Sequence, residues 1–173
     1  MEFKRLTSSQ DPLYQQAMDL YAASFPLHEQ RLPVSQAAIL ADPAYRFELL
    51  FESEQWAGLL LCWETPEFLY VEHFCTLPQL RGGGLGQKAL ELLHREGKPV
   101  ILEIDPPADP VSCRRKAFYE RCGYCANPFP HVHPAYRPAF SGHPLVVLSY
   151  PAPLTEALFQ DFSHYLQTTV MGQ

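Results

Sequence analysis

Apolar residues recur every three or four positions in two segments near the ends of the chain. Between Asp11 and Phe25 this spacing predicts a first helix, which Pro26 would end, and a second, shorter helix is expected from about Ser35. From Leu154 to Thr169 the same spacing predicts a closing amphipathic helix. Its apolar stripe fits the chain's own core and a second copy of the chain equally well, so a homodimer is a possible state.

The middle of the chain contains runs of β-branched, aromatic and other apolar residues, which predict strands. Residues 45–53 and 55–65 predict a hairpin, and further strands are expected over residues 67–77, 99–105 and 144–150. Helices are expected between them, from Leu85 to Glu96 and over residues 112–124. This order predicts an α/β (α+β mixed) fold, with a mixed sheet flanked by helices in a single domain spanning residues 1–173.

The composition excludes several classes of protein. Hydrophobic residues make up 47% of the 173 residues and aromatics 13%, which indicates a packed interior rather than disorder. The net charge of -6 argues against a nucleic-acid partner, because affinity for phosphate backbones comes mainly from clustered Lys and Arg. The N-terminus lacks the apolar core of a signal peptide and no run of eighteen apolar residues occurs, so we expect no membrane association and a cytoplasmic location, with the five cysteines as reduced thiols.

Four glycines stand within residues 82–86, between the third predicted strand and a helix. Glycine permits positive φ and leaves no Cβ to block a ligand, and free amides at a helix start favour an anion such as phosphate. The ATP-type loop does not fit, because Ala89 follows Lys88 where a hydroxyl residue is required. Gly84, Gly86 and Ala89 do match the dinucleotide fingerprint, which keeps a dinucleotide-binding protein as an alternative, although Pro78 and polar residues separate these glycines from the strand.

Arg81, Gly84 and Gly86 also satisfy the pattern R/Q-x-x-G-x-G/A, between a strand and a helix. With "VILEID" and "KAFYERCGY" following in order, the chain resembles the GNAT superfamily of acetyl-CoA-dependent N-acetyltransferases over most of its length. The early "SFPLHEQR" is similar to a segment of small bacterial members. The resemblance implies a mostly antiparallel sheet whose central parallel strands splay apart, and acetyl-CoA as co-substrate.

The resemblance also implies where the coenzyme lies. Its pyrophosphate would rest on the backbone amides of Arg81, Gly82, Gly83, Gly84, Leu85, Gly86 and Gln87. Its pantetheine arm would pair like an extra strand with Phe74, Cys75 and Thr76. Many relatives carry a coenzyme-contacting asparagine near the position of Ser112, which makes Ser112 a further candidate.

Acyl transfer to an amine needs a neutral nucleophile and a protonated leaving thiolate. Glu103 and Glu72, on neighbouring predicted strands, are the candidate bases. The resemblance places Tyr119 where the family carries the tyrosine that protonates the coenzyme sulfur. The predicted activity is transfer of an acetyl group to a primary amine of a small molecule or peptide, and the alternative is a non-catalytic acyl-CoA-binding module.

The acceptor pocket is expected between "SFPLHEQR" and the proline-rich residues 127–144. Cys122, Cys125, His131 and His133 form C-x2-C-x5-H-x-H, which could make a tetrahedral zinc site. We expect no metal there, because five residues containing two prolines are a short gap for a zinc finger. The sequence therefore identifies the acyl donor but not the acceptor.

Overall fold

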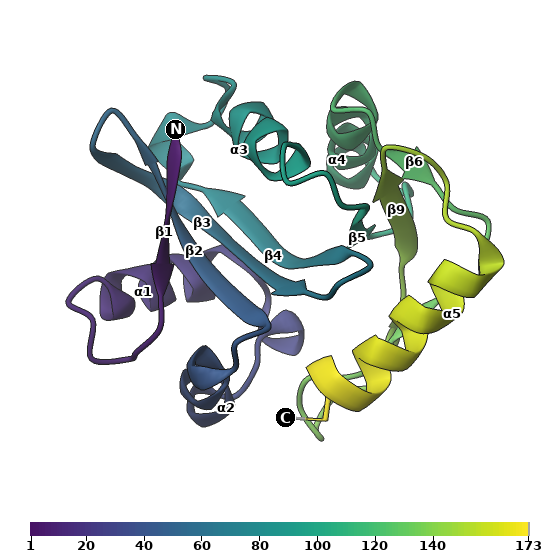
Figure 1. Cartoon of the computed structure of the whole chain (residues 1–173), viewed down its shortest axis with the longest axis horizontal. Helices are drawn as coiled ribbons and strands as arrows, with labels where there is room; N and C mark the ends of the chain where they lie inside the picture. Colours follow the sequence, from purple (N-terminus) through teal and green to yellow (C-terminus); the bar gives the residue numbers. More distant parts are fainter. Residues whose placement is uncertain (173) are drawn as a thin grey trace.

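The computed structural model describes residues 1–172, so Gln173, the last residue of the predicted domain, lies outside the described part. One sheet has the strand order β1-β2-β3-β4-β5-β9-β6, and a two-stranded ribbon pairs β7 with β8 (Figure 1). The strands are β1 Glu2–Leu6, β2 Tyr45–Glu52, β3 Gln55–Glu64, β4 Leu69–Thr76, β5 Val100–Ile104, β6 Cys125–Ala126, β7 Val132–His133, β8 His143–Pro144 and β9 Val146–Tyr150. All neighbours in the large sheet are antiparallel except β4 and β5, so the predicted mixed, mostly antiparallel sheet is confirmed.

The predicted helices form, with shifted ends. They are α1 Tyr14–Ser24, α2 Pro33–Ala38, α3 Leu85–His94, α4 Pro110–Arg121 and α5 Glu156–Tyr165, with single turns η1 Leu27–Glu29, η2 Ile39–Ala41, η3 Pro78–Leu80 and η4 Leu166–Val170. The closing helix begins at Glu156 rather than at Leu154, because the Thr155 side chain accepts a hydrogen bond from the Leu158 amide and caps it. Strand β1 was missed, because only Leu6 of this edge strand is buried and the run lacks a clear apolar alternation.

Helices cover both faces of the sheet. On one face α1, η2 and α5 pack on the side chains of alternate strand residues, with Tyr21, Trp63 and Phe162 almost fully buried. On the other face α3 and the C-terminal part of α4 pack on the intervening residues, including Leu90 and Tyr119. The apolar stripe of α5 therefore packs against this chain's own core.

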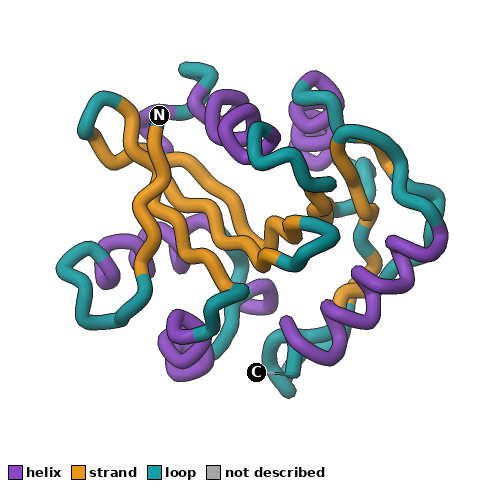
Figure 2. The backbone as a smooth tube through the Cα atoms, in the orientation of Figure 1, coloured by secondary structure: helices purple, strands orange, loops and turns teal. Residues whose placement is uncertain are grey.

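Strands β4 and β5 pair only at their beginnings. Leu69, Tyr70 and Val71 lie opposite Val100, Ile101 and Leu102, and the two strands separate beyond these pairs (Figure 2). The register between β3 and β4 shifts at this point, because Leu61 lies opposite His73 while Cys62 lies opposite Val71. Glu72 is thus the extra residue of a β-bulge, and such a bulge bends the strand away from its neighbour.

Within residues 1–172 no helix combines the length and apolar character that crossing a membrane requires. Over the same residues all five cysteines are free thiols.

A substitution at Gly58 of β3 tests how closely β3 and β4 pack beside this opening. A Cβ at Gly58 would lie 2.3 Å from the Cys75 carbonyl oxygen and 2.8 Å from the Thr76 Cα, so the two strands would have to shift. We expect Gly58→Ala to lower the free energy of unfolding by about 1–3 kcal/mol, as overpacking does, measured by urea denaturation. Gly83→Ala is the control, because its nearest atom would be the Leu80 oxygen at 3.5 Å; equal unfolding midpoints for the two variants would contradict the prediction.

Candidate active site

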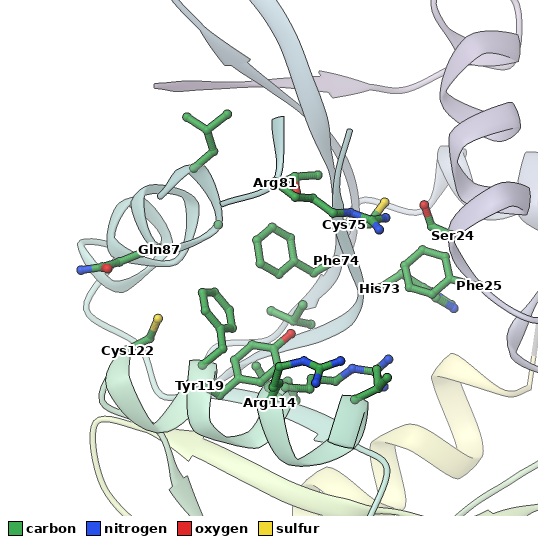
Figure 3. A pocket seen from close by; sticks show the side chains of 18 of the residues that line it. Ser24, Phe25, His73, Phe74, Cys75, Arg81, Gln87, Arg114, Tyr119 and Cys122 are labelled. Carbon is green, nitrogen blue, oxygen red and sulfur yellow. The ribbon is translucent and has the colours of Figure 1, made fainter. Parts of the chain in front are cut away.

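A cavity of about 940 Å³ opens where β4 and β5 separate. Its walls come from the end of α1, the second half of β4, the glycine loop with the start of α3, and one face of α4. Figure 3 shows Phe74 of β4 and Arg114 and Tyr119 of α4 pointing into the same space, with Ser24 and Phe25 at the end of α1 on its far side. The cavity therefore brings together segments that span almost one hundred residues of sequence.

The glycine loop gives α3 a bare N-terminus. Gly82 and Gly84 have φ of +83° and +76°, and Gly84 is the N-cap residue of α3 without any side-chain cap. The first amides of α3 are therefore not occupied by a capping side chain, and they carry the positive end of the helix dipole. Of the seven predicted loop residues, all except Gly83 line the cavity: Arg81, Gly82, Gly84, Leu85, Gly86 and Gln87.

Gly86 lets this helix start approach its neighbours. A Cβ at Gly86 would lie 3.1 Å from Phe118 Cζ of α4 and 3.7 Å from Phe74 Cζ of β4. The loop is thus held against both walls of the cavity. Lys88, one turn into α3, pairs with Glu52 of β2 instead of adding its charge to the loop.

In the described chain, residues Phe74 to Thr76 of β4 have one unpaired edge. Phe74, Cys75 and Thr76 pair with β3 on one side and line the cavity. On the other side β5 has already diverged, and within residues 1–172 no strand pairs with this edge. Its backbone groups therefore face the cavity, where an extended ligand can bind them.

Tyr119 projects from α4 into the cavity and is only 9% exposed. Burial raises the pKa of Tyr119 to about 12, although the nearby Arg115 charge opposes the shift. The phenol therefore remains protonated at neutral pH and is available as a proton donor.

Glu72 lines the cavity from the bulge of β4, yet its carboxylate is buried and fully engaged. Arg31 donates to its Oε1 from Nε and Nη2, at 3.1 and 2.8 Å, and the Trp63 indole donates to its Oε2 at 2.9 Å. Burial alone would raise the pKa of Glu72, but the Arg31 charge, together with His73 and the indole hydrogen bond, holds it below its ordinary value. Glu72 is therefore an ionised carboxylate neutralised by a guanidinium.

Glu103 occupies the matching place on β5. Its Oε2 accepts a hydrogen bond from the Tyr70 hydroxyl at 2.5 Å, its Oε1 pairs with His131 Nε2, and His133 Nε2 lies 3.8 Å from Oε2. Burial would raise the pKa of Glu103, but the His131 hydrogen bond, the two histidines and Tyr70 lower it overall. Both predicted bases therefore line the cavity as ionised groups, and sequence reasoning missed their partners Arg31 and His131.

The Ser112 side chain takes part in the N-terminal cap of α4. The Ser112 amide donates to Asp109 Oδ1 and the Asp109 amide donates to Ser112 Oγ, both at 3.1 Å, which forms a capping box at the start of α4. The Ser112 hydroxyl also donates to Asp109 Oδ2 at 2.8 Å. Ser112 is not among the residues that line the cavity; α4 presents Arg114 and Arg115 there instead. The local pattern of Asp109, Pro110 and Ser112 could have indicated this cap from the sequence.

His73 is both a buried core residue and part of the cavity wall. It is 4% exposed, contacts the rings of Tyr21 and Phe25 edge-on, and lines the cavity. Its Nε2 donates to the Glu29 carbonyl oxygen at 2.8 Å. This bond fixes the "SFPLHEQR" segment against β4, and Ser24, Phe25, Pro26 and Glu29 of that segment line the cavity as expected.

Known proteins share this architecture. Residues 11–124, more than half of the chain, match the family described as Acetyltransferase (GNAT) family. The chain belongs to the GNAT acetyltransferase family. As a GNAT protein it is similar to YjbC of Bacillus subtilis (strain 168), a protein assigned by name to the acetyltransferases, with 28% identity over 99 residues. That alignment spans 56% of this chain and 50% of YjbC, so it covers only half the length of that relative.

Solved structures extend the likeness over the whole chain. A GNAT-family protein from Bacteroides thetaiotaomicron superposes with a TM-score of 0.93 at 28% identity, covering 100% of this chain and 99% of the other. An aminoglycoside 6'-N-acetyltransferase complexed with coenzyme A has a TM-score of 0.62 at 13% identity, covering 90% of this chain and 100% of the other. The ribosomal-protein-S18-alanine N-acetyltransferase from Escherichia coli has a TM-score of 0.60 at 17% identity, covering 89% and 95%. At 13% and 17% identity, the similarity of this chain to the latter two proteins shows a common fold and no more.

Removal of Arg31 tests the buried ion pair. Arg31→Met would leave Glu72 as a buried, uncompensated carboxylate, and we expect it to lower the free energy of unfolding by about 3–5 kcal/mol at pH 7. The double variant Arg31→Met/Glu72→Gln should recover much of this loss. Lys116→Met, which breaks a surface pair with Glu120, is the control and should cost less than about 1 kcal/mol. Additive effects of the Arg31 and Glu72 changes in denaturant unfolding would contradict the assignment.

The same pair predicts an acid-dependent stability. The pKa of Glu72 is lower in the folded protein than in the unfolded chain, so its contribution is complete above the unfolded value of about 4.3 and is lost as the pH falls through the folded value. We therefore expect the stability difference between the wild type and Glu72→Gln to shrink below about pH 4. Urea unfolding at several pH values measures it, and a constant difference would contradict the prediction.

Proposed function

We propose that this protein transfers the acetyl group of acetyl-CoA to a primary amine of a small molecule or peptide. The observation that carries the proposal is the uncapped N-terminus of α3, reached through the positive-φ glycines Gly82 and Gly84, opening on the cavity between β4 and β5. Membership of the GNAT family and the coenzyme A bound by the structurally similar aminoglycoside acetyltransferase support it. The dinucleotide alternative loses support, because η3 separates α3 from β4 and because the sheet that contains β4 is mostly antiparallel.

The residues that line the cavity suit the parts of acetyl-CoA. The amides from Arg81 to Gln87 would hold the pyrophosphate, with the Arg81 and Arg114 guanidinium groups at the same cavity. The free edge of Phe74 to Thr76 would bind the amides of the pantetheine arm, as a strand would. The thioester would then lie between β4 and α4, near Tyr119.

The acceptor must lose a proton before it attacks, because an alkylamine with a pKa of ~10.4 is almost wholly protonated at neutral pH. Of the two predicted bases, Glu103 is better suited to pass this proton on through water. Its partners include the imidazoles of His131 and His133, whose ring nitrogens can donate or accept a proton, whereas the guanidinium of Arg31 only donates and neutralises Glu72. Glu72 would then mainly hold the shape of the bulge beside the acceptor.

The neutral amine attacks the thioester carbonyl carbon, a C–N bond forms and the C–S bond breaks. The electron pair leaves on the coenzyme sulfur, and Tyr119 donates its phenolic proton to that thiolate. Because burial keeps Tyr119 protonated, its acid form persists across the physiological range. Holding both reactants in one cavity supplies a further part of the rate.

Tyr119→Phe tests the proton donor. We expect turnover to fall by about 10²-fold or more, the typical contribution of a general acid, while calorimetry shows unchanged acetyl-CoA affinity. Tyr124→Phe is the matched control: its hydroxyl bonds to His94 Nε2 at 3.1 Å and it does not line the cavity. Equal turnover of Tyr119→Phe and Tyr124→Phe would remove the acid role.

Titration calorimetry with acetyl-CoA and, separately, with NAD tests the donor. We expect binding heat with acetyl-CoA and none with NAD. Arg81→Ala should bind acetyl-CoA more weakly, because it removes a guanidinium that would contact the pyrophosphate. Thiol release across a panel of amines then tests catalysis. Binding of NAD alone would overturn the proposed donor, and acetyl-CoA binding without thiol release for any amine would favour the non-catalytic alternative.

A further inference from the structure

Two histidines and a glutamate meet at the far end of the site, where the "SFPLHEQR" segment faces the proline-rich loop. One donor atom from each of His28, Glu29 and His143 lies within 4.8 Å of the other two. Within residues 1–172, no other group of three or more His, Cys, Asp or Glu side chains lies close enough together to hold an ion. The set shares no residue with the motif C-x2-C-x5-H-x-H.

The three side chains come from two segments that backbone contacts already hold together. His28 and Glu29 are neighbours in η1, and His143 is paired with His133 in the β7–β8 ribbon. Arg137, in the loop between β7 and β8, donates to the carbonyl oxygens of Gln30 and Arg31 at 2.8 and 3.1 Å. The donors are thus placed without an ion, which lowers the free-energy cost of forming a site.

Unmet hydrogen-bonding groups surround the same place. His143 Nε2 and His133 Nε2 are buried and have no hydrogen-bond partner in the described chain. His133 is 2% exposed and donates from Nδ1 to the Pro134 carbonyl oxygen at 2.6 Å, while its Nε2 lies 3.8 Å from Glu103 Oε2, beyond hydrogen-bond distance. Such buried orphan atoms are costly and call for an explanation, which a bound cation supplies.

The carboxylates nearby favour a cation as well. A small pocket of about 60 Å³ is lined by Glu29, Asp105 and Glu103 together with His133 and His143. Arg115 is the positive group of this lining, and it pairs with Asp105 at 2.6 Å. Carboxylates therefore outnumber the guanidinium.

We propose that His28, Glu29 and His143 bind a divalent transition-metal ion of the zinc class. Two imidazole nitrogens and one carboxylate form a donor set typical of zinc sites that keep an open fourth position, whereas Ca²⁺ and Mg²⁺ prefer oxygen donors throughout. Glu29 also lines the main cavity, so the ion would lie at the acceptor end of the site. This inference stands apart from the proposed acetyl transfer, because metal binding is measured without any substrate.

Direct titration tests the site. Protein freed of metal by chelation is titrated with Zn²⁺, and we expect one equivalent to bind and to raise the unfolding temperature. His143→Ala and Glu29→Gln should each weaken Zn²⁺ binding by about tenfold or more, in keeping with losses at metal sites. His164→Ala, an exposed histidine of α5, is the matched control and should bind as the wild type does.

Two further measurements separate this site from other sources of zinc binding. Cys122→Ser/Cys125→Ser should leave the affinity unchanged, and Co²⁺ bound in place of zinc should show no thiolate charge-transfer band. His28→Ala without metal should unfold at the wild-type temperature, and Zn²⁺ should no longer raise that temperature. Loss of binding in the cysteine variant, equal binding by the histidine variants, or no stoichiometric Zn²⁺ uptake would each overturn the proposal.

Discussion

The structure depends on one interrupted pairing, between β4 and β5. Parallel strands in a sheet normally continue side by side, but here three residue pairs are followed by divergence at the bulge of Glu72. The divergence leaves the Phe74 to Thr76 edge without a strand and opens the cavity of about 940 Å³. The end of α1, the start of α3 and one face of α4 form the remaining walls of the cavity, and these helices pack on the two faces of the sheet.

The opening between β4 and β5 exposes polar groups that need hydrogen-bond partners. Two buried carboxylates line it. Glu72 lies on β4 and Glu103 on β5, and each is bonded by a side chain from a segment distant in sequence. Arg31 reaches Glu72 from the segment after α1 and also bonds the Val170 carbonyl oxygen at 2.6 Å, which ties the C-terminal turn to the site. His131 reaches Glu103 from the proline-rich loop. Polar contacts between segments distant in sequence therefore hold this end of the cavity together, in addition to apolar packing.

The two ends of the cavity differ in chemistry. The glycine loop end offers backbone amides, a helix N-terminus and arginines, which suit an anionic donor. The opposite end gathers carboxylates and imidazoles, which suit a cation. This polarity is consistent with a cationic amine as acceptor and with a metal ion beside it, because both ligands would place positive charge among the same carboxylates.

The sequence by itself determined the local features. Apolar spacing predicted the helices and central strands, and the glycines predicted the bare start of α3, because turns, caps and helix faces depend on neighbouring residues. The family resemblance carried by "KAFYERCGY" pointed to Tyr119, which lines the cavity. Only the tertiary structure decided which partners meet: Arg31 with Glu72 across 41 residues, His131 with Glu103 across 28, and His28 and Glu29 with His143. It also showed that Ser112 pairs with the N-cap residue Asp109 of α4 and that β1 is an edge strand. Long-range pairings depend on how β4, β5 and the loops pack in space, and no local pattern of residues encodes that packing.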